Sequence, residues 1–371
     1  MSLVWVLLAL WVGVAQAAPA AQSPGALQAA PTTDPTAAAD EAVRAWLARE
    51  PLSPVALAGV PAEELCRELP GLLENPPPPQ GTTVNFGNRV ERPTEDPATR
   101  RYTYPVTLPG GRLEVLEVVL REEGNAWNAE RVGLQREPTP TIPAFFQTPV
   151  AAWGFVLLTL GLLYGLARPS FFRRWLAEGW GYVKAHRRLV IGTVALLYGL
   201  FTLGVFSGAA LPPVCQAAIS EIVARGVAGL GATEAYESGN VARAAVVTMY
   251  QNFVMGTLVT TYGVALISFG ALAYLLNGAR FLALGLPFGF LTQADPVTLL
   301  AVLVLIVVEL MAYVLVTAGG GMLLATLVRE GFGGFRLAFR KLTMTLPIAF
   351  LLLVIGAWYE AAIIILPTLL G

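Results

Sequence analysis

Two carboxylates lie within stretches that are long and apolar enough to cross a membrane. Glu309 falls in residues 297–318 and Glu360 in residues 342–366. A charged side chain at the centre of a bilayer costs at least about 2.5–3.5 kcal/mol, so each needs a polar partner, a water-filled cavity or a proton. The two residues could form a proton or cation pathway or hold a partner helix. Alternatively, they could be protonated or hydrogen-bonded glutamates that fix helix packing and cap backbone groups at a helix break. The sequence favours the last, structural role.

Two asparagines flank an apolar stretch that carries a stripe of glycines. Asn252 begins and Asn277 follows a predicted helix over 252–276. Gly256, Gly263 and Gly270 recur along it at heptad spacing. Small residues on one stripe allow close helix packing in lipid. Their types and places favour helix capping for both asparagines. The order of the helices further predicts that Asn252, Asn277, Glu309 and Glu360 share one buried polar cluster.

The two cysteines, Cys66 and Cys215, fall in segments that we predict to lie on the outer, oxidising side of the membrane. They could form a disulfide that joins the soluble domain to an outer loop, or each could be a buried thiol. The residues alone leave both alternatives open.

Enzymatic chemistry finds little support in the residues. His186 is the single histidine and has only Glu178 as a nearby acid, which makes neither a zinc site nor a Ser-His pair. No glycine-rich phosphate loop ending in Lys-Ser or Lys-Thr is present. Gly331–Gly334 predicts a cytoplasmic turn rather than a lipid-phosphate site. We therefore predict a non-enzyme with no catalytic residues, metal or cofactor. The net charge of −1 gives no general attraction for nucleic acid.

The elements that position these residues are mostly membrane helices. Of 371 residues, 55% are hydrophobic and only 13% charged. This composition predicts an all-α polytopic bundle of five to six membrane segments, one of them short or re-entrant, with a small N-terminal α+β domain outside the membrane.

The N-terminal part divides into three predicted segments. Residues 1–17 read as a signal peptide, either cleaved after Ala15-Gln16-Ala17 or kept as an anchor. Residues 18–39, rich in Ala, Pro and Thr, predict a flexible linker. Residues 40–140 predict an extracytoplasmic domain whose elements are helices over 41–49 and 61–69 and strands over 82–90, 101–108, 112–121 and 126–134.

Residues 141–371 predict the membrane domain. A loop with Arg168, Arg173, Arg174, Lys184, Arg187 and Arg188 follows the first span and should be cytoplasmic. Arg280 and a basic cluster from Arg329 to Lys341 should lie on the same side. The intervening chain must then cross an even number of times, so 281–294 would be a half-helix or re-entrant element paired with 297–318. The predicted spans are 149–167, 189–211, 252–276, 281–294 (short), 297–318 and 342–366.

Residues 189–366 resemble the stage II sporulation protein M family of integral membrane proteins. The resemblance rests on short pieces in a fixed order: Tyr250-Gln-Asn252 with Gly256, Leu276-Asn-Gly278, Leu284-Gly285, Val308-Glu309-Leu310 and Ala357-Trp-Tyr-Glu360-Ala. The family usually carries Pro-His-Gly before its acidic residue, where this chain has Val304, Leu305 and Ile306. The exported domain lies outside the resemblance.

The resemblance implies a non-enzymatic membrane scaffold in the bacterial cytoplasmic (inner) membrane. The signal peptide and the basic loop after the first span predict that residues 18–148 lie on the extracytoplasmic side. Its expected partners are membrane lipids and cell-envelope proteins such as peptidoglycan hydrolases. The alternative function is a transporter or channel, because broken helices and an intramembrane acid such as Glu309 often mark substrate sites.

Overall fold

The computed structural model describes residues 32–49, 61–67, 77–94, 96–135, 142–228, 232–290 and 296–370. The predicted signal peptide and most of the predicted linker lie outside these residues. The chain divides into two compact units. One is an α+β unit of residues 18–139 and 212–222, called the soluble unit here after the sequence prediction, and the other is a helical unit that includes residues 140–211 and 223–371.

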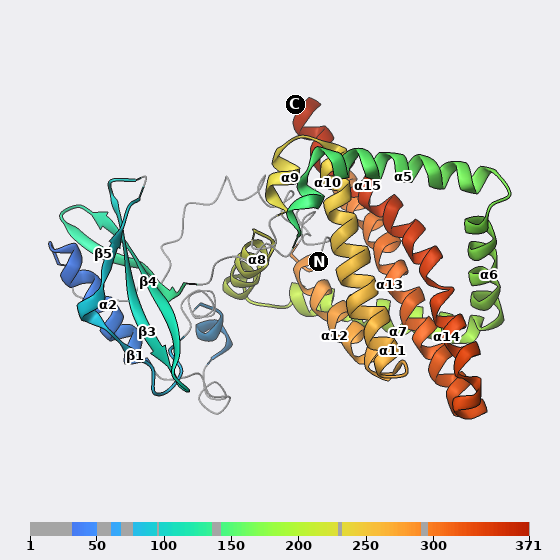
Figure 1. The fold of residues 1–371 in the computed structure, drawn as a ribbon, viewed down its shortest axis with the longest axis horizontal. Helices are drawn as coiled ribbons and strands as arrows, with labels where there is room; N and C mark the ends of the chain where they lie inside the picture. The colour runs from blue at the N-terminus through green and yellow to red at the C-terminus, as the bar shows by residue number, and fades with distance from the viewer. Residues whose placement is uncertain are drawn as a thin grey trace. The chain divides into compact units, whose positions relative to one another are not determined.

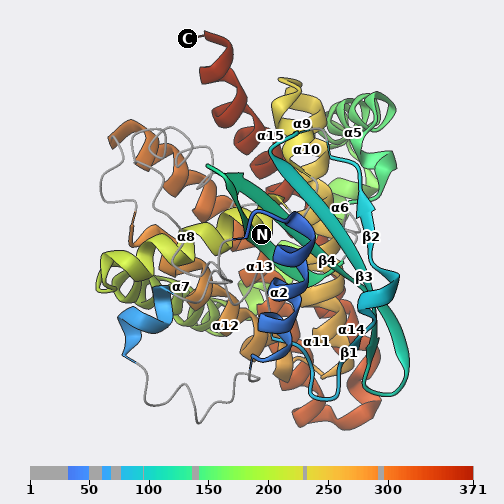
Figure 2. The same cartoon turned by 90° about the vertical axis from the view of Figure 1, so that its left-hand side faces the viewer.

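The soluble unit is a twisted antiparallel sheet with a helix on one face. Helix α2 lies along this face in both views (Figures 1 and 2). Its central strands pair in sequence order, β3 with β4 and β4 with β5, while β1 and β2 both pair with β3. The elements are α2 (Pro35–Leu47), β1 (Thr83–Val84), the 3₁₀ turn η1 (Phe86–Asn88), β2 (Val90–Arg92), β3 (Thr99–Leu108), β4 (Arg112–Glu123) and β5 (Ala126–Leu134).

The core of the soluble unit lies between α2 and the sheet. Trp46 of α2 is 1% exposed and packs in one apolar cluster with side chains of β3, β4 and β5. A polar contact adds to it, because Asp40 of α2 accepts hydrogen bonds from Tyr104 Oη at 2.8 Å and from Arg89 Nη1 at 2.6 Å. The helix is therefore fixed to the sheet by both apolar and charged contacts.

Three details of the soluble unit differ from the sequence predictions. Helix α2 begins at Pro35, inside the predicted linker, because Asp34 caps it and the small Ala38 and Ala39 pack into the core. The predicted strand 82–90 is interrupted by η1, where the side chain of Asn85 accepts a bond from the Gly87 amide. The unit also includes residues 212–222 from far along the chain, which a continuous domain of 40–140 did not allow for.

The helical unit contains several helices joined by short turns (Figure 1). Its elements, together with α8, which begins in the soluble unit's second segment, are η2 (Ala144–Gln147), α5 (Pro149–Ala167), α6 (Phe171–Ala185), α7 (Arg187–Ala209), α8 (Pro213–Ala228), α9 (Thr233–Glu237), α10 (Val241–Met249), the π-helix η3 (Tyr250–Gly263), α11 (Val264–Ile267), α12 (Ala271–Phe288), α13 (Pro296–Glu330), η5 (Gly331–Gly334), α14 (Phe335–Thr343) and α15 (Leu346–Leu370).

Four helical stretches among the described residues are long and apolar enough to cross a membrane. They are Pro149–Ala167, Arg187–Ala209, Ala271–Phe288 and Pro296–Pro367, the last of which contains α13 and most of α15. The protein is therefore membrane-embedded, as its composition predicts.

The long helices alternate in direction. Contacts of α13 with η3 and α11 advance together along both chains, from Asn252 beside Glu309 to Ala265 beside Gly320, so these helices are parallel. Contacts of α13 with α7, α12 and α15 run in opposite order, as in the pairs Glu309 with Gly356 and Gly319 with Thr345. Helices α7, α12 and α15 thus run one way, and α10–α11 and α13 the other.

The predicted single helix over 252–276 is wrong. The chain leaves helical geometry after Ile267, where Phe269 has φ 53° and Gly270 has φ 96°. A tight turn at these residues reverses the chain into α12, and Gly270 lies against the carbonyl of Gly320. The first half is itself a π-helix, in which the hydroxyls of Thr257, Thr260 and Thr261 donate to carbonyls five residues earlier.

The predicted short element over 281–294 is also wrong. Residues 281–288 are the second half of α12, and residues 291–294 lie outside the described part of the chain. Helix α12 packs in parallel on α7, with the backbones in close contact at Gly204 and Gly208 of α7 and at Gly285 and Gly289. Two four-residue glycine spacings facing each other allow this approach.

Helix α13 is longer than predicted. It continues without a break through Gly319–Gly321 to Glu330, for 35 residues. The three glycines lie where other chains pack closely, against Thr345, Ala265 and Tyr274. They provide space for neighbouring helices rather than a bend. The last span begins at Leu346 rather than at residue 342, which belongs to α14.

Candidate functional site

A buried polar cluster lies between helices η3, α13 and α15. The amide Nδ2 of Asn252 donates to Glu309 Oε1 at 2.9 Å, and Asn252 Oδ1 accepts from Tyr313 Oη at 3.1 Å. Asn252 and Glu309 are each 1% exposed and Tyr313 is 2% exposed. Because η3 and α13 are parallel and in contact, residues one turn apart on α13 reach the same asparagine. Asn252 is thus an interior residue of the continuous helix formed by α10, η3 and α11, and not the predicted N-cap.

Glu360 brings a second carboxyl to this cluster from α15. It is 0% exposed, and neither of its oxygens has a hydrogen-bond partner in the structure. Its polar neighbours are Glu309 and Tyr236 of α9. The side chain of Glu309 lies against Gly356, one helical turn before Glu360, and a Cβ at Gly356 would stand 2.9 Å from Glu309 Cγ. The glycine therefore makes the space in which the two acids meet.

A cation completes the cluster on the side of α12. The guanidinium carbon of Arg280 lies 4.1 Å from the centre of the Tyr313 ring. This is a cation–π contact, which is strongest in surroundings without water. The sequence placed Arg280 at the inner end of a span, but it lies in the middle of α12. The error follows from the missed turn at Phe269 and Gly270.

Asn277 stands apart from the other three predicted cluster residues. Its Nδ2 donates to the carbonyl of Ala273 at 2.9 Å, and its Oδ1 accepts from Thr261 Oγ1 at 3.4 Å. It is an interior residue of α12 and does not end a helix as predicted. The structure thus brings together Asn252, Glu309 and Glu360, and it leaves Asn277 in a separate contact between α12 and η3.

The predicted glycine stripe has three different environments. Gly256 lies under the Tyr313 ring, where a Cβ would stand 2.8 Å from Tyr313 Oη, so it is a true packing position. A Cβ on Gly263 would meet only the carbonyl of Leu258 in its own helix, at 3.2 Å. Gly270 belongs to the turn before α12. A single packing stripe through all three glycines is therefore wrong.

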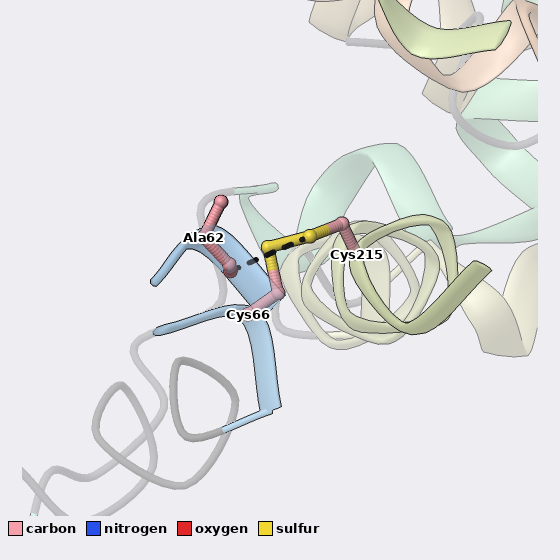
Figure 3. The surroundings of a disulfide bond; sticks show 3 residues. All are labelled: Ala62, Cys66 and Cys215. Atoms are coloured by element: carbon pink, nitrogen blue, oxygen red, sulfur yellow. Dashed lines mark hydrogen bonds between the residues drawn. A yellow bond between two sulfur atoms is a disulfide. The ribbon is translucent and has the colours of Figure 1, made fainter. Parts of the chain in front are cut away.

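Cys66 and Cys215 form a disulfide within the soluble unit, with their Cα atoms 4.8 Å apart (Figure 3). Cys66 lies in the helical turn of residues 62–67, and Cys215 lies in the first turn of α8. Cys215 is 0% exposed, and its sulfur is 3.6 Å from the carbonyl oxygen of Ala62. This is a contact and not a hydrogen bond, since a disulfide sulfur carries no proton.

The structure also places His186, the histidine that the sequence analysis considered. His186 lies at the end of α6, with Nδ1 3.0 Å from the carbonyl of Tyr182. Among the described residues no group of three His, Cys, Asp or Glu side chains is arranged to hold a metal ion.

Comparison with known proteins gives no identification. No family model, no curated protein and no solved structure matches this chain. Inference about its function therefore rests on the residues and their geometry.

Sequence reasoning missed Tyr313, Arg280, Tyr236 and Gly356 as members of the cluster. Tyr313 lies four residues after Glu309, and Gly356 four residues before Glu360, so both share a helix face with a predicted residue. That spacing could have identified both as members of the cluster. The sequence gives no such indication for Arg280 and Tyr236, because their positions depend on the turn at Phe269 and on the path of α9.

Proposed function

We propose that this protein is a non-enzymatic scaffold of the bacterial cytoplasmic membrane that displays its soluble domain to partners in the cell envelope. The observation that carries the proposal is the disulfide between Cys66 and Cys215. It closes a soluble unit made from two chain segments, one before α5 and one after α7. A domain attached to the membrane chain at both places cannot drift away on a single linker. Such attachment suits a fixed platform.

The distribution of positive charge supports the proposed orientation. The end of α6 and the start of α7 carry Lys184, Arg187 and Arg188, and α14 carries Arg336, Arg340 and Lys341. Glu178 of α6 binds Arg340 of α14 at 2.6 Å, so these basic segments meet at one end of the helices. Under the positive-inside rule this end is cytoplasmic.

The alternating directions of the helices support five crossings of the membrane. The crossing elements would be α7, the continuous helix of α10, η3 and α11, and then α12, α13 and α15. Helix α5 would be the sixth. With the basic end inside, α7 runs outward and delivers residue 212 to the extracytoplasmic side, where the soluble unit would lie. Oxidising conditions on that side agree with a persistent disulfide.

The resemblance to the stage II sporulation protein M family supports the class of partner. The founding member of that family holds peptidoglycan-degrading enzymes at a membrane, which is the role proposed here. We propose peptidoglycan hydrolases as the partners of the soluble unit.

Site-specific photo-crosslinking in native membranes tests the proposal. A photoreactive residue would replace Arg112 at the turn between β3 and β4, where its side chain is 70% exposed. The matched control replaces the exposed Arg174 on α6, at the basic end. We expect envelope proteins, among them peptidoglycan hydrolases, to be captured from position 112 and not from position 174. Capture of none, or of the same proteins from both positions, would contradict the proposal.

Transport is the second candidate, favoured by the buried carboxyls of Glu309 and Glu360 beside a π-helix. Ionisable residues within a membrane often lie on an ion or proton path. Vesicles containing the purified protein and a pH-sensitive dye separate the two functions. A scaffold gives no proton or ion flux above that of empty vesicles, whereas a flux abolished by Glu309→Gln would establish transport.

A further inference from the structure

The carboxyls of Glu309 and Glu360 lie beside each other in a place from which water is excluded. Glu309 is 1% and Glu360 0% exposed, and they belong to antiparallel helices in contact at Gly356. Glu309 has a donor of its own, the Asn252 amide at 2.9 Å. Glu360 is wholly buried, and no hydrogen bond of ordinary geometry reaches its oxygens, although Tyr236 and Glu309 lie beside them. Buried polar groups without partners are rare, so these oxygens require an explanation.

Two ionised carboxylates cannot satisfy each other, because both are acceptors only. One proton changes this, since a protonated carboxyl donates a single hydrogen bond and the neighbouring carboxylate accepts it. Carboxyl pairs that share a site therefore retain one proton. A proton shared with Glu309 would give the buried oxygens of Glu360 the hydrogen bond that they otherwise lack.

The charges around the pair also indicate one proton for the two carboxyls. The titratable groups beside the pair are Tyr313 of α13 and Tyr236 of α9, and Arg280 of α12 lies over the ring of Tyr313. Two carboxylates and one guanidinium leave one negative charge in the cluster, and a single proton makes it neutral. A neutral cluster is the form that low-polarity surroundings favour.

We propose that Glu309 and Glu360 together form one proton-binding site and share a single proton within the helix bundle. The proton lies on Glu360, which donates to Glu309, while Asn252 donates to the other oxygen of Glu309. A metal cation is the poorer occupant. Glu309 Oε1 already accepts from Asn252 and Asn252 Oδ1 from Tyr313, which leaves too few oxygens for coordination.

This site does not depend on the proposed scaffold function. Next to it, the hydroxyl of Tyr236 is hydrogen-bonded to Thr248 Oγ1 of α10. Tyr236 belongs to the short helix α9, which precedes α10 on the proposed outer side. Tyr236 therefore connects the carboxyl pair to α9 and, through Thr248, to α10.

Infrared spectroscopy of the full-length protein in lipid nanodiscs at neutral pH tests the proposal. We expect the carbonyl stretch of a protonated carboxyl in the wild type and its loss in both Glu360→Gln and Glu309→Gln. In each variant the glutamine amide supplies the donor that the proton supplied. Glu178→Gln, which changes an ion-paired carboxylate at the basic end, is the matched control and should keep the band.

Absence of the band in the wild type, or its persistence in both glutamine variants, would overturn the proposal. A band absent in sodium-free buffer, together with thermal stability that increases with added sodium, would assign the site to a metal cation instead.

A second measurement needs no variant and so holds if the variants fail to fold. Dicyclohexylcarbodiimide reacts with protonated carboxyls in apolar surroundings. We expect mass spectrometry of the treated wild type to find the adduct on Glu360 or Glu309, in an amount that falls as the pH rises. Labelling of neither residue at any pH would overturn the proposal.

Discussion

At the scale of single residues, the buried acids are tolerated because small and polar neighbours were placed around them. Gly356 gives Glu309 its space, and Asn252 gives it a donor. Tyr313 joins this pair to Arg280, so that residues of η3, α12, α13 and α15, together with Tyr236 of α9, contribute to one polar cluster. Each contact is made by a different element, and the cluster therefore also fixes how the helices pack.

The space at Gly356 yields a direct prediction. In Gly356→Ala the new Cβ would stand 2.9 Å from Glu309 Cγ, and we expect a loss of about 1–3 kcal/mol, the usual range for overpacking. Gly154→Ala on α5 is the matched control, since nothing lies within 4 Å of a Cβ there. Thermal unfolding in detergent measures both. Equal melting temperatures for the two variants would show that a methyl group at position 356 fits beside Glu309, which would contradict the prediction.

The contact between Tyr104 and Asp40 predicts a pH-dependent contribution to stability. Burial and the hydrogen bond to Asp40 raise the pKa of Tyr104 above its ordinary value. This contribution is therefore complete below about pH 10, the ordinary pKa of tyrosine, and it is lost as the pH rises through the higher folded-state pKa.

We expect Tyr104→Phe to lower the unfolding free energy by about 1–2 kcal/mol at neutral pH, with a smaller difference at strongly alkaline pH. Thermal unfolding of the full-length protein across this pH range measures it, with the exposed Tyr164→Phe as control. A stability difference between wild type and Tyr104→Phe that increases with pH would contradict the predicted direction of the pH dependence.

The sequence predicted which buried residues need a polar partner better than it predicted which partner each one has. An acid or amide within an apolar stretch needs a polar neighbour, and this reasoning found Asn252, Glu309 and Glu360. It misplaced Asn277 and Arg280, because the turn at Ser268–Gly270 carries only one glycine and no charge, within a stretch that is otherwise apolar. A turn of this kind depends on the close contact of Gly270 with Gly320, which the sequence does not reveal.

At the scale of elements, helix packing is governed by glycines that face backbone rather than by glycines that break helices. Gly204 and Gly208 of α7 meet the carbonyls of Leu282 and Leu286 of α12. Gly319–Gly321 likewise accept neighbours without interrupting α13. The sequence predicted helices that correspond to α5, α7, α13 and α15, since long apolar runs identify them. It was wrong in treating the basic segment that forms α6 as a loop. The ends and pairings of the helices were less accessible, because they depend on contacts between segments far apart in the chain.

The packing of α7 on α12 can be tested with glycines of one helix. In Gly208→Ala the new methyl would overlap the Leu286 carbonyl, so the helices must separate, and we expect a loss of at least about 1–3 kcal/mol. Gly199→Ala, also on α7, has nothing within 4 Å of the added Cβ and should be close to neutral. Chemical unfolding in mixed detergent gives both values. A destabilisation of the same size in both variants would point to helix propensity rather than packing.

At the scale of the whole molecule, the chain leaves the helices after α7, contributes residues 212–222 to the soluble unit and returns. The structure divides the chain near residue 140, where the sequence predicts the boundary between its two domains. It did not show that the second segment belongs to the first unit, because two cysteines alone do not reveal whether they pair. The disulfide supplies that information, and it is the basis of the proposed scaffold.

The most direct test of this account is cleavage of the chain between its two units. A protease site inserted between Gln135 and Ile142 would cut the chain after the soluble unit's first segment. We predict that the soluble fragment remains attached to the helical fragment on a non-reducing gel, that reductant releases it, and that Cys66→Ser releases it without reductant. Release of the fragment from the wild type without reductant would contradict the account.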